Sequence, residues 1–171
     1  MLKTITSRAL ATGTAVFAAT ICLPAPALAA TVSAPLTVNA TVTANCTVST
    51  SPLAFGDVDS TSASDVDAAG GLSITCTNGS GWTASADVGS GSGASFANRR
   101  MTSGANLLNY NIYTTAARTV VWGDGTGSTA TIGGTGSGSA QAVTVYGRVA
   151  GGQTSVPIGS YADTVSVTVT Y

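Results

Sequence analysis

The most regular pattern in the chain covers residues 31–48, where apolar or small side chains alternate with polar ones. This two-residue period predicts a β-strand with one buried face. At roughly 3.3 Å per residue, one strand of this length would measure about 60 Å, whereas strands usually stop at about 10 residues. Either the run breaks into two strands, or its first half reaches outside its own domain. The apolar phase consists of Val32, Ala34, Leu36, Val38, Ala40, Val42, Ala44, Cys46 and Val48.

Shorter alternating segments follow, separated by turns rich in Gly, Ser and Asn. The chain has no Glu and only one Lys, and no long segment repeats with the 3.6-residue period of a helix. About seven short strands at this spacing predict an all-β fold, specifically a β-sandwich. The clearest strand candidates are residues 40–48, 72–76, 82–88, 107–114, 119–123, 143–149 and 161–171.

For the segments between these strands, the sequence pattern is weaker and predicts mainly loops. Residues 52–58 form a short strand candidate with Leu53 and Phe55 inward, and residues 56–71 are predicted to form an acidic, Ser-rich loop. Residues 124–139 are predicted to form a long loop with at most a weak strand at 129–132. The neighbouring pair Arg99 and Arg100 is predicted to lie on the solvated surface.

The N-terminal residues have the pattern of a secretory signal peptide. Lys3 and Arg8 precede an uncharged apolar run at residues 9–23, and Ala27-Leu28-Ala29 forms a small-x-small cleavage site. We expect cleavage after Ala29, so that residues 1–29 are removed and the mature protein is exported. No later run approaches the roughly 18 apolar residues that span a bilayer.

The charged residues of the mature chain exclude several functions. The mature chain would contain four arginines and seven aspartates, which gives a net charge near −3. It therefore lacks the basic surface that nucleic-acid binding needs. Without His or Lys after residue 29, Ser–His and Ser–Lys catalysis cannot be built. The spacing of Asp57, Asp59, Asp65 and Asp67 departs from the EF-hand pattern, so we expect a solvated acidic loop rather than a calcium site. We therefore expect no enzyme activity, no cofactor and no metal site.

Cleavage would remove Cys22 and leave only Cys46 and Cys76. In an oxidising compartment these two are expected to form a disulfide, although free thiols are the alternative. The loop of about 30 residues that they close would contribute about 3 to 4 kcal/mol on the chain-entropy estimate. Trp82 and Trp122 are expected in the core or on a sheet face rather than in a sugar-binding platform.

We expect the last alternating run, residues 161–171, to be unprotected along one edge, because neither Pro nor Lys nor a following segment would cover it. Such an edge is normally an aggregation hazard. The sequence thus combines a spare strand at its start with an unfilled edge at its end, and the two features fit each other.

Four stretches of the mature chain follow a known family pattern in the family's order. They are the arm leading into Asn-Cys-Thr-Val at 45–48; residues 110–113 with 116–118; Trp-Gly-Asp-Gly-Thr at 122–126; and residues 145–149 followed by 159–163 and the alternation to Tyr171. In these stretches the chain resembles the spore coat protein U domain family, which includes subunits of archaic (Csu-type) chaperone–usher pili.

The resemblance implies an incomplete immunoglobulin-like β-sandwich that lacks its last strand. Residues 30–39 would be an N-terminal donor-strand arm and residues 40–171 the pilin domain, with Pro35 on the polar phase of the arm. A periplasmic chaperone, and then the arm of a neighbouring pilin at an outer-membrane usher, would fill the groove. The donor side chains would be Val32, Ala34, Leu36 and Val38, and the edge of the groove would carry Val165, Val167, Val169 and Tyr171.

The implied function is that of a structural pilus subunit, exported through the periplasm to the cell surface, where it supports adhesion and biofilm formation. Two alternatives stay open. The first is a secreted spore-coat or surface-layer protein of the same family, and the second is a carbohydrate-binding adhesin module. The alternative for the arm itself is an intramolecular strand or a frayed terminus.

Overall fold

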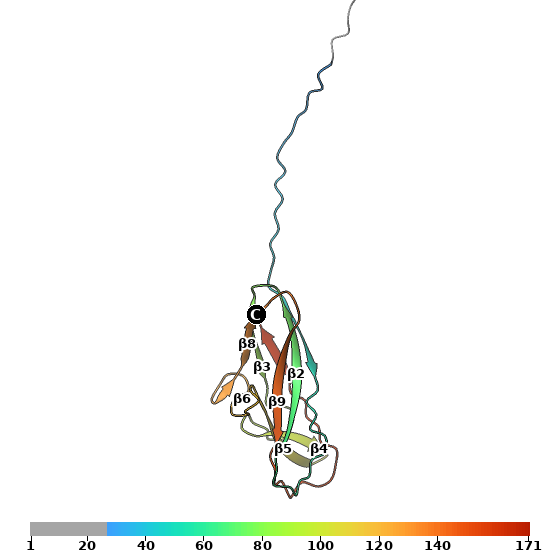
Figure 1. Ribbon diagram of the computed structural model, residues 1–171, viewed down its shortest axis with the longest axis vertical. Helices are drawn as coiled ribbons and strands as arrows, with labels where there is room; N and C mark the ends of the chain where they lie inside the picture. The colour runs from blue at the N-terminus through green and yellow to red at the C-terminus, as the bar shows by residue number, and fades with distance from the viewer. Residues whose placement is uncertain (1–26) are drawn as a thin grey trace, which may run out of the picture. The chain divides into compact units, whose positions relative to one another are not determined.

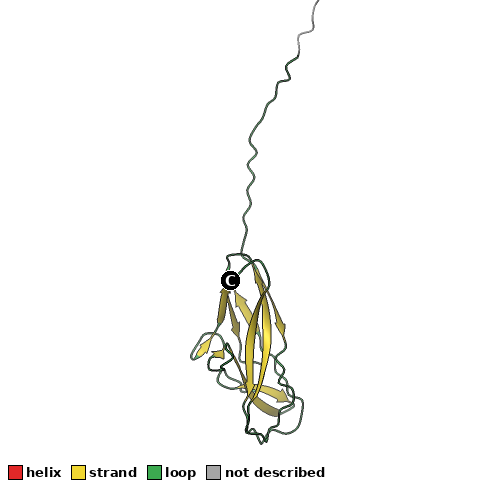
Figure 2. Cartoon of the chain, viewed as in Figure 1, coloured by secondary structure: helices red, strands yellow, loops and turns green. Residues whose placement is uncertain are grey.

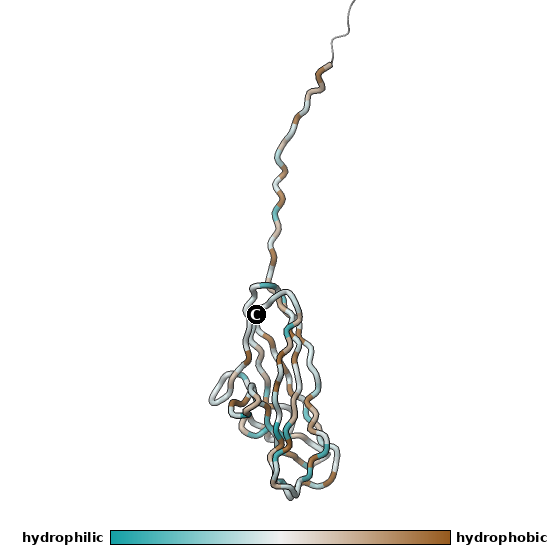
Figure 3. The backbone as a smooth tube through the Cα atoms, viewed as in Figure 1, coloured by the Kyte–Doolittle hydropathy of each residue, from teal (hydrophilic) through white to brown (hydrophobic). Residues whose placement is uncertain are grey.

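A computed structural model describes residues 27–171. Most of the predicted signal peptide, residues 1–26, lies outside the described residues. The contacts divide the chain into two units, Met1–Asn39 and Ala40–Tyr171. In the first unit, residues 27–39 form no strand, and apolar and polar positions alternate along residues 31–39 (Figure 3). Val32 is 97% exposed, Leu36 87% and Val38 82%.

The second unit consists of two β-sheets, and the described residues contain no helix (Figure 2). Except for one parallel pair, β6 with β7, all strands pair antiparallel. The larger sheet has the order β1 (Cys46–Ser51), β2 (Val66–Cys76), β9 (Gln141–Val149), β5 (Asn106–Tyr113), β6 (Val121–Trp122), β7 (Thr129–Ala130), with β4 (Arg99–Ser103) attached to β5. The smaller sheet has the order β10 (Val167–Thr170), β3 (Gly81–Ala86), β8 (Ile132–Thr135).

The core lies between the inward faces of these strands (Figure 1). Even-numbered side chains of β2, β3 and β5 and odd-numbered side chains of β9 point into it, as the alternation of the sequence predicts. This confirms the strands predicted at 72–76, 107–114 and 143–149. The buried apolar residues are Leu72, Ile74, Cys76, Trp82, Ala84, Ala86, Leu108, Tyr110, Ile112, Trp122, Val145 and Val149.

Two ends of the larger sheet serve as reference points below. Strand β2 is its longest strand, and it runs from Val66, which pairs with Val149, to Cys76, which pairs with Cys46. At roughly 3.3 Å per residue, β2 is about 36 Å long. We call its two ends the Val66 pole and the Cys76 pole.

Segment 52–58 is not the strand that the sequence predicted. After Ser51 the chain leaves the ladder with β2, and Leu53 and Phe55 turn onto the inner face of the large sheet. They pack over Gly70 and Gly147, where an added Cβ would lie 2.9 and 2.6 Å from Leu53 atoms. Glycine at these two positions makes room for the two large side chains.

Three predicted boundaries differ from the structure. The acidic loop ends at Asp65, because β2 starts at Val66 and pairs with β9 along residues with small side chains. The first strand of the domain starts at Cys46, not at residue 40. The predicted strand at 161–171 is regular only over Val167–Thr170. The weak strand at 129–132 is present as two short strands, β7 and β8.

The prediction that Arg99 lies on the surface is wrong, because its side chain is fully buried. The guanidinium donates to the carbonyl of Asp87 at 2.6 and 3.1 Å, to the carbonyl of Trp122 at 2.8 Å and to Oδ1 of Asn111 at 2.7 Å. It also lies 5.4 Å from the ring centroid of Phe96. Burial lowers the pKa of this arginine below its ordinary value. The hydrogen bonds compensate for burying its charge.

Replacing Arg99 by methionine should lower the free energy of unfolding by about 3 kcal/mol, because the carbonyls of Trp122 and Asp87 lose a charged donor and each unsatisfied buried group costs about 1 to 3 kcal/mol. Asn111 Oδ1 would keep only the Ile112 N–H. Urea unfolding of the mature chain, followed by tryptophan fluorescence, measures the change. Arg100→Met is the matched control, since Arg100 is only half-buried and makes one hydrogen bond, to the Ser92 carbonyl. Equal losses for the two variants would contradict the role of Arg99.

Candidate functional site: an open groove between the sheets

An open groove runs along the domain between its first and last segments. Two cavities form it, one of about 200 Å³ and one of about 720 Å³. They share three lining residues, Leu53, Phe55 and Met101. Because these residues belong to both cavities, the two openings are parts of one groove.

The smaller cavity lies beside the core. One wall consists of Thr50 and Ser51 at the end of β1, and the other of Val165, just before β10, and Val167, the first residue of β10. The floor is built from core side chains of four strands of the large sheet, namely Leu72, Tyr110, Ile112, Trp122 and Val145. These floor side chains are themselves buried, so the cavity lies directly over the core, between the free edges of β1 and β10.

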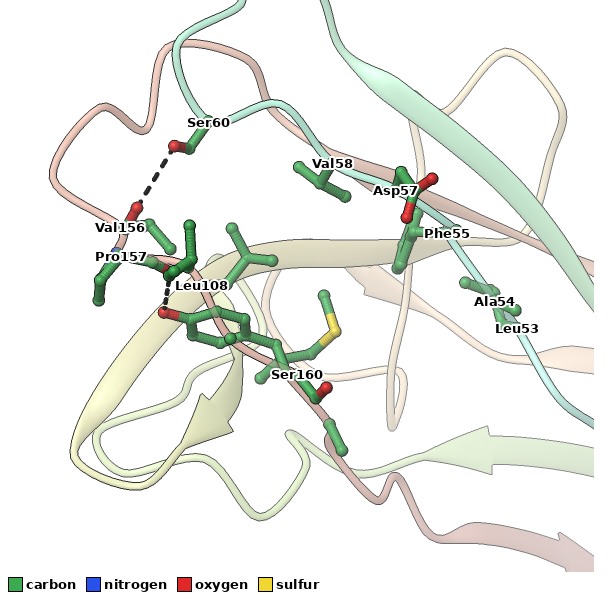
Figure 4. Close-up of a pocket in the computed structure, with 16 residues that line it drawn as sticks. Leu53, Ala54, Phe55, Asp57, Val58, Ser60, Leu108, Val156, Pro157 and Ser160 are labelled. Carbon is green, nitrogen blue, oxygen red and sulfur yellow. Dashed lines mark hydrogen bonds between the residues drawn. The ribbon is translucent and has the colours of Figure 1, made fainter.

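The larger cavity lies towards the Val66 pole, between segment 53–60 and residues 156–162 (Figure 4). Two hydrogen bonds fix its outer rim: Ser60 Oγ donates to the Val156 carbonyl at 3.3 Å, and the Tyr161 hydroxyl donates to the Pro157 carbonyl at 2.8 Å. Its apolar lining includes Leu53, Phe55, Val58, Met101, Leu108, Val156 and Tyr161.

The two strands that flank the groove have no partner on their groove sides within the described residues. Strand β1 pairs only with β2, and β10 pairs only with β3. Side chains of residues 161–169 alternate between half-buried and exposed, with the half-buried ones packed on the core or lining the groove. Backbone groups at such free edges can hydrogen-bond to an added strand.

Asp163 is the one charged residue among those that line the smaller cavity. Its Oδ1 accepts hydrogen bonds from the backbone N–H and the hydroxyl of Ser90, both at 2.7 Å, and from the Thr164 N–H at 2.7 Å. Its Oδ2 accepts from the Tyr110 hydroxyl at 2.6 Å. The carboxylate is fully used inside the domain, and it ties the wall of the groove to the β3–β4 connection and to β5.

A second aspartate supports the same wall. Asp87 Oδ1 accepts from the Ser166 N–H at 2.9 Å, while the Asp87 N–H donates to the Ser166 carbonyl at 3.1 Å. The carbonyl of Asp87 is in turn held by buried Arg99. Residues 163–166 precede the ladder of β10, so these side-chain contacts replace strand pairing there.

Tyr110 has a buried ring and a hydroxyl that points to Asp163. Burial is the main cause that raises the pKa of Tyr110 above its ordinary value, and the hydrogen bond to Asp163 raises it further. The phenol therefore stays neutral in the folded protein at pH values where an ordinary tyrosine ionises. Its ring also meets Phe55 edge to face, with centroids 6.1 Å apart.

The predicted disulfide joins Cys46 to Cys76, which face each other in the β1–β2 ladder with Cα atoms 4.1 Å apart. It fixes the edge strand at the Cys76 pole. The groove-edge residues Val165, Val167 and Val169 are half-buried beside the core, and Tyr171 is 55% exposed. The donor-arm residues Val32, Ala34, Leu36 and Val38 are exposed and lie in the other unit, so their role stays a prediction.

Other candidates have structural roles. Both tryptophans are buried, and their indole N–H groups donate to Gln141 Oε1 and to the Ala84 carbonyl. Asp65 and Asp67 pair with Arg148, and Asp67 also pairs with Arg118. Within residues 27–171 no cluster of three metal-ligating side chains is present, and no helix there could span a membrane.

No local pattern in the sequence indicates the roles of Arg99 and Asp163. A partial signal existed for Tyr110, because a tyrosine on the apolar face of a strand needs a partner for its hydroxyl. The partner itself lies 53 residues away and could not be identified from local pattern.

The fold and the groove define a class of protein, an all-β domain of two sheets with a groove between two unpaired strand edges. The chain belongs to the Spore Coat Protein U domain family, which matches residues 32–168. This confirms the resemblance seen in the sequence. The family is one of structural, non-enzymatic proteins.

A solved structure has the same fold. It is the crystal structure of the CsuC–CsuE chaperone–tip adhesion subunit pre-assembly complex from archaic chaperone–usher Csu pili of Acinetobacter baumannii. The match has a TM-score of 0.51 and 22% sequence identity, and it covers 77% of this chain and 41% of the matched chain. This chain thus spans less than half the length of that chain. A search of curated proteins found no match.

The raised pKa of Tyr110 predicts how stability changes at high pH. An unfolded chain loses this proton near pH 10, whereas the folded protein keeps it. The free energy of unfolding should therefore fall as pH rises above about 10, by up to about 1.4 kcal/mol per pH unit for this one group. Tyr110→Phe should reduce that slope, as measured by urea unfolding at several pH values. Identical slopes in the two proteins would contradict the assignment.

Proposed function

We propose that this protein is a structural subunit of a surface pilus and that it polymerises by donor-strand complementation. In this proposal the domain is an immunoglobulin-like sandwich that lacks its last strand. The arm of a neighbouring copy or of a related pilin fills the groove in the finished fibre. The observation that carries the proposal is an apolar groove between two unpaired strand edges, together with an exposed, strictly alternating segment at residues 31–38.

Backbone geometry supports a strand as the occupant of the groove. An added strand would hydrogen-bond to the free edges of β1 and β10, and only an extended segment matches such edges along their length. The wall side chains repeat every second residue from Tyr161 to Val169, and the apolar side chains of the arm repeat with the same period. The two sets can therefore interleave along the groove.

Hydrophobic burial supports the arm as the source of this strand. Val32, Leu36 and Val38 are each more than 80% exposed in the described unit. Burying each such side chain is favourable by about 1.5 to 3 kcal/mol before the cost of ordering the arm. The groove would gain as well, since its half-buried lining would lose contact with water.

Export and assembly follow from the same proposal. The signal peptide directs the chain to the periplasm, where a chaperone holds the open groove, and an outer-membrane usher then exchanges the chaperone for the arm of the next subunit. The solved relative comes from a chaperone complex of a chaperone–usher pilus, which supports these partners. A head-to-tail contact of this type does not close on itself, so it produces a filament.

A substitution on the apolar phase of the arm tests the proposal. A synthetic peptide of residues 31–44 should bind the subunit whose residues 31–38 are deleted. Leu36→Asp in the peptide should weaken binding at least about 30-fold, because it removes about 2 kcal/mol of apolar burial and places a charge in the groove. Fluorescence anisotropy of a labelled peptide measures the affinity.

Thr37→Asp is the matched control, because residue 37 is on the polar phase and should tolerate the charge with little loss. In the full chain, deletion of residues 31–38 should leave a subunit that still binds its chaperone but cannot extend a fibre. Polymerisation of the truncated chain, or equal effects of the two Asp substitutions, would refute the donor assignment.

A further inference from the structure

The connector between arm and domain, residues 40–45, is anchored at the Cys76 pole. The Asn45 N–H donates to Thr77 Oγ1 at 3.1 Å, and the Thr77 N–H donates to the Asn45 carbonyl at 2.9 Å. Thr77 Oγ1 also lies 3.4 Å from the Thr43 carbonyl. Val42 nevertheless has no apolar cover, since its side chain is 84% exposed.

A second uncovered apolar side chain lies at the other end of the groove. Ile158 is fully exposed, on the bend that forms the rim of the larger cavity. We call residues 156–160 the lip. The lip is held by the bond from Tyr161 to the Pro157 carbonyl, and at Gly159 an added Cβ would lie 2.8 Å from Ser103 Oγ. The isoleucine is therefore displayed on an ordered bend.

The direction of a donor strand decides which pole it leaves. Strand β1 runs away from the Cys76 pole and β10 runs towards it, so a donor between their free edges is antiparallel to one of them and parallel to the other. We take it as antiparallel to β10, because every strand pair in the small sheet is antiparallel. A donor antiparallel to β10 enters at the Cys76 pole and leaves at the Val66 pole. The opposite direction would bring it out at the Cys76 pole, where the acceptor's own connector is already anchored.

The spacing of residues then places Val42 at the lip. If Val32 to Val38 lie beside the half-buried wall positions 161–169, Val32 is opposite residue 169 or 167, and Val38 is opposite 163 or 161. Val42 follows Val38 by four residues, so in an extended connector it lies about 13 Å further along, past the end of the wall and at the level of the lip that carries Ile158.

Resting on the proposed function, we propose that the lip around Ile158 is the surface on which one copy of this chain docks the connector of the next copy, with Val42 against Ile158. The contact lies outside the set of donor side chains at 32–38. It covers two exposed apolar side chains at once and holds consecutive domains head to tail with a short, immobilised connection.

Chemical cross-linking of assembled polymer tests this contact. In the variant Val42→Cys with Ile158→Cys, a short bismaleimide should link neighbouring copies into a ladder of covalent dimers, trimers and larger species on denaturing gels. Within one copy the two positions lie at opposite poles of a domain whose β2 is about 36 Å long, so an internal link is excluded. Both residues are exposed, so the substitutions should not disturb folding.

Val42→Cys with Val120→Cys is the matched control, because Val120 is also an exposed valine and lines neither cavity. It should give at least tenfold less cross-linked product. In the single variant Ile158→Cys, the thiol should react with maleimide at least tenfold more slowly in polymer than in the chaperone-bound subunit.

The possible failures are distinct. Polymer that forms normally but gives no ladder, or that leaves the residue 158 thiol fully reactive, would overturn the lip contact and leave the donor strand intact. If the unmodified chain forms no polymer with its chaperone and usher, the proposed function itself fails.

Discussion

The two free strand edges of β1 and β10 impose the constraint on which the rest of this domain depends. Each edge has backbone groups without a strand partner in the described chain, and between them lie apolar side chains that stay half in water. Such an edge normally invites unspecific pairing. Here the edges flank a groove whose floor belongs to the core, so whatever pairs with them also completes the core. Stability and assembly are therefore coupled in one feature.

A disulfide, side-chain packing and side-chain hydrogen bonds hold the two walls of this groove where strand pairing is missing. The disulfide fixes β1 at the Cys76 pole, and Leu53 and Phe55 fill the inner face of the large sheet where β1 ends. On the other wall, Asp87 and Asp163 hold the segment before β10 through side-chain hydrogen bonds, and buried Arg99 holds the loop that carries Asp87. The buried part of this network, around Arg99, fixes one geometry, because a departure there leaves buried groups unsatisfied.

The strands, the disulfide and the family were within reach of the sequence, because alternation, cysteine count and short motifs are local signals. The predicted start of β2 was wrong, because the small side chains in the first half of this strand hide the alternation of apolar and polar positions. The turn of Leu53 and Phe55 onto Gly70 and Gly147 depends on residues far away in sequence, as does the bond between Ser90 and Asp163, which are 73 residues apart. The burial of Arg99 cannot be predicted from an Arg-Arg pair, because its acceptors, on Asp87, Asn111 and Trp122, belong to other segments of the chain.

The central claim is that residues 31–38 complete the core of another copy. Hydrogen exchange of the arm amides in assembled polymer, compared with the chaperone-bound subunit, tests it most directly. Strand pairing in the groove predicts that exchange of these amides slows at least about 100-fold in polymer, equivalent to about 2.8 kcal/mol of opening free energy. Arm amides that exchange in polymer as fast as in the chaperone-bound subunit would contradict the account.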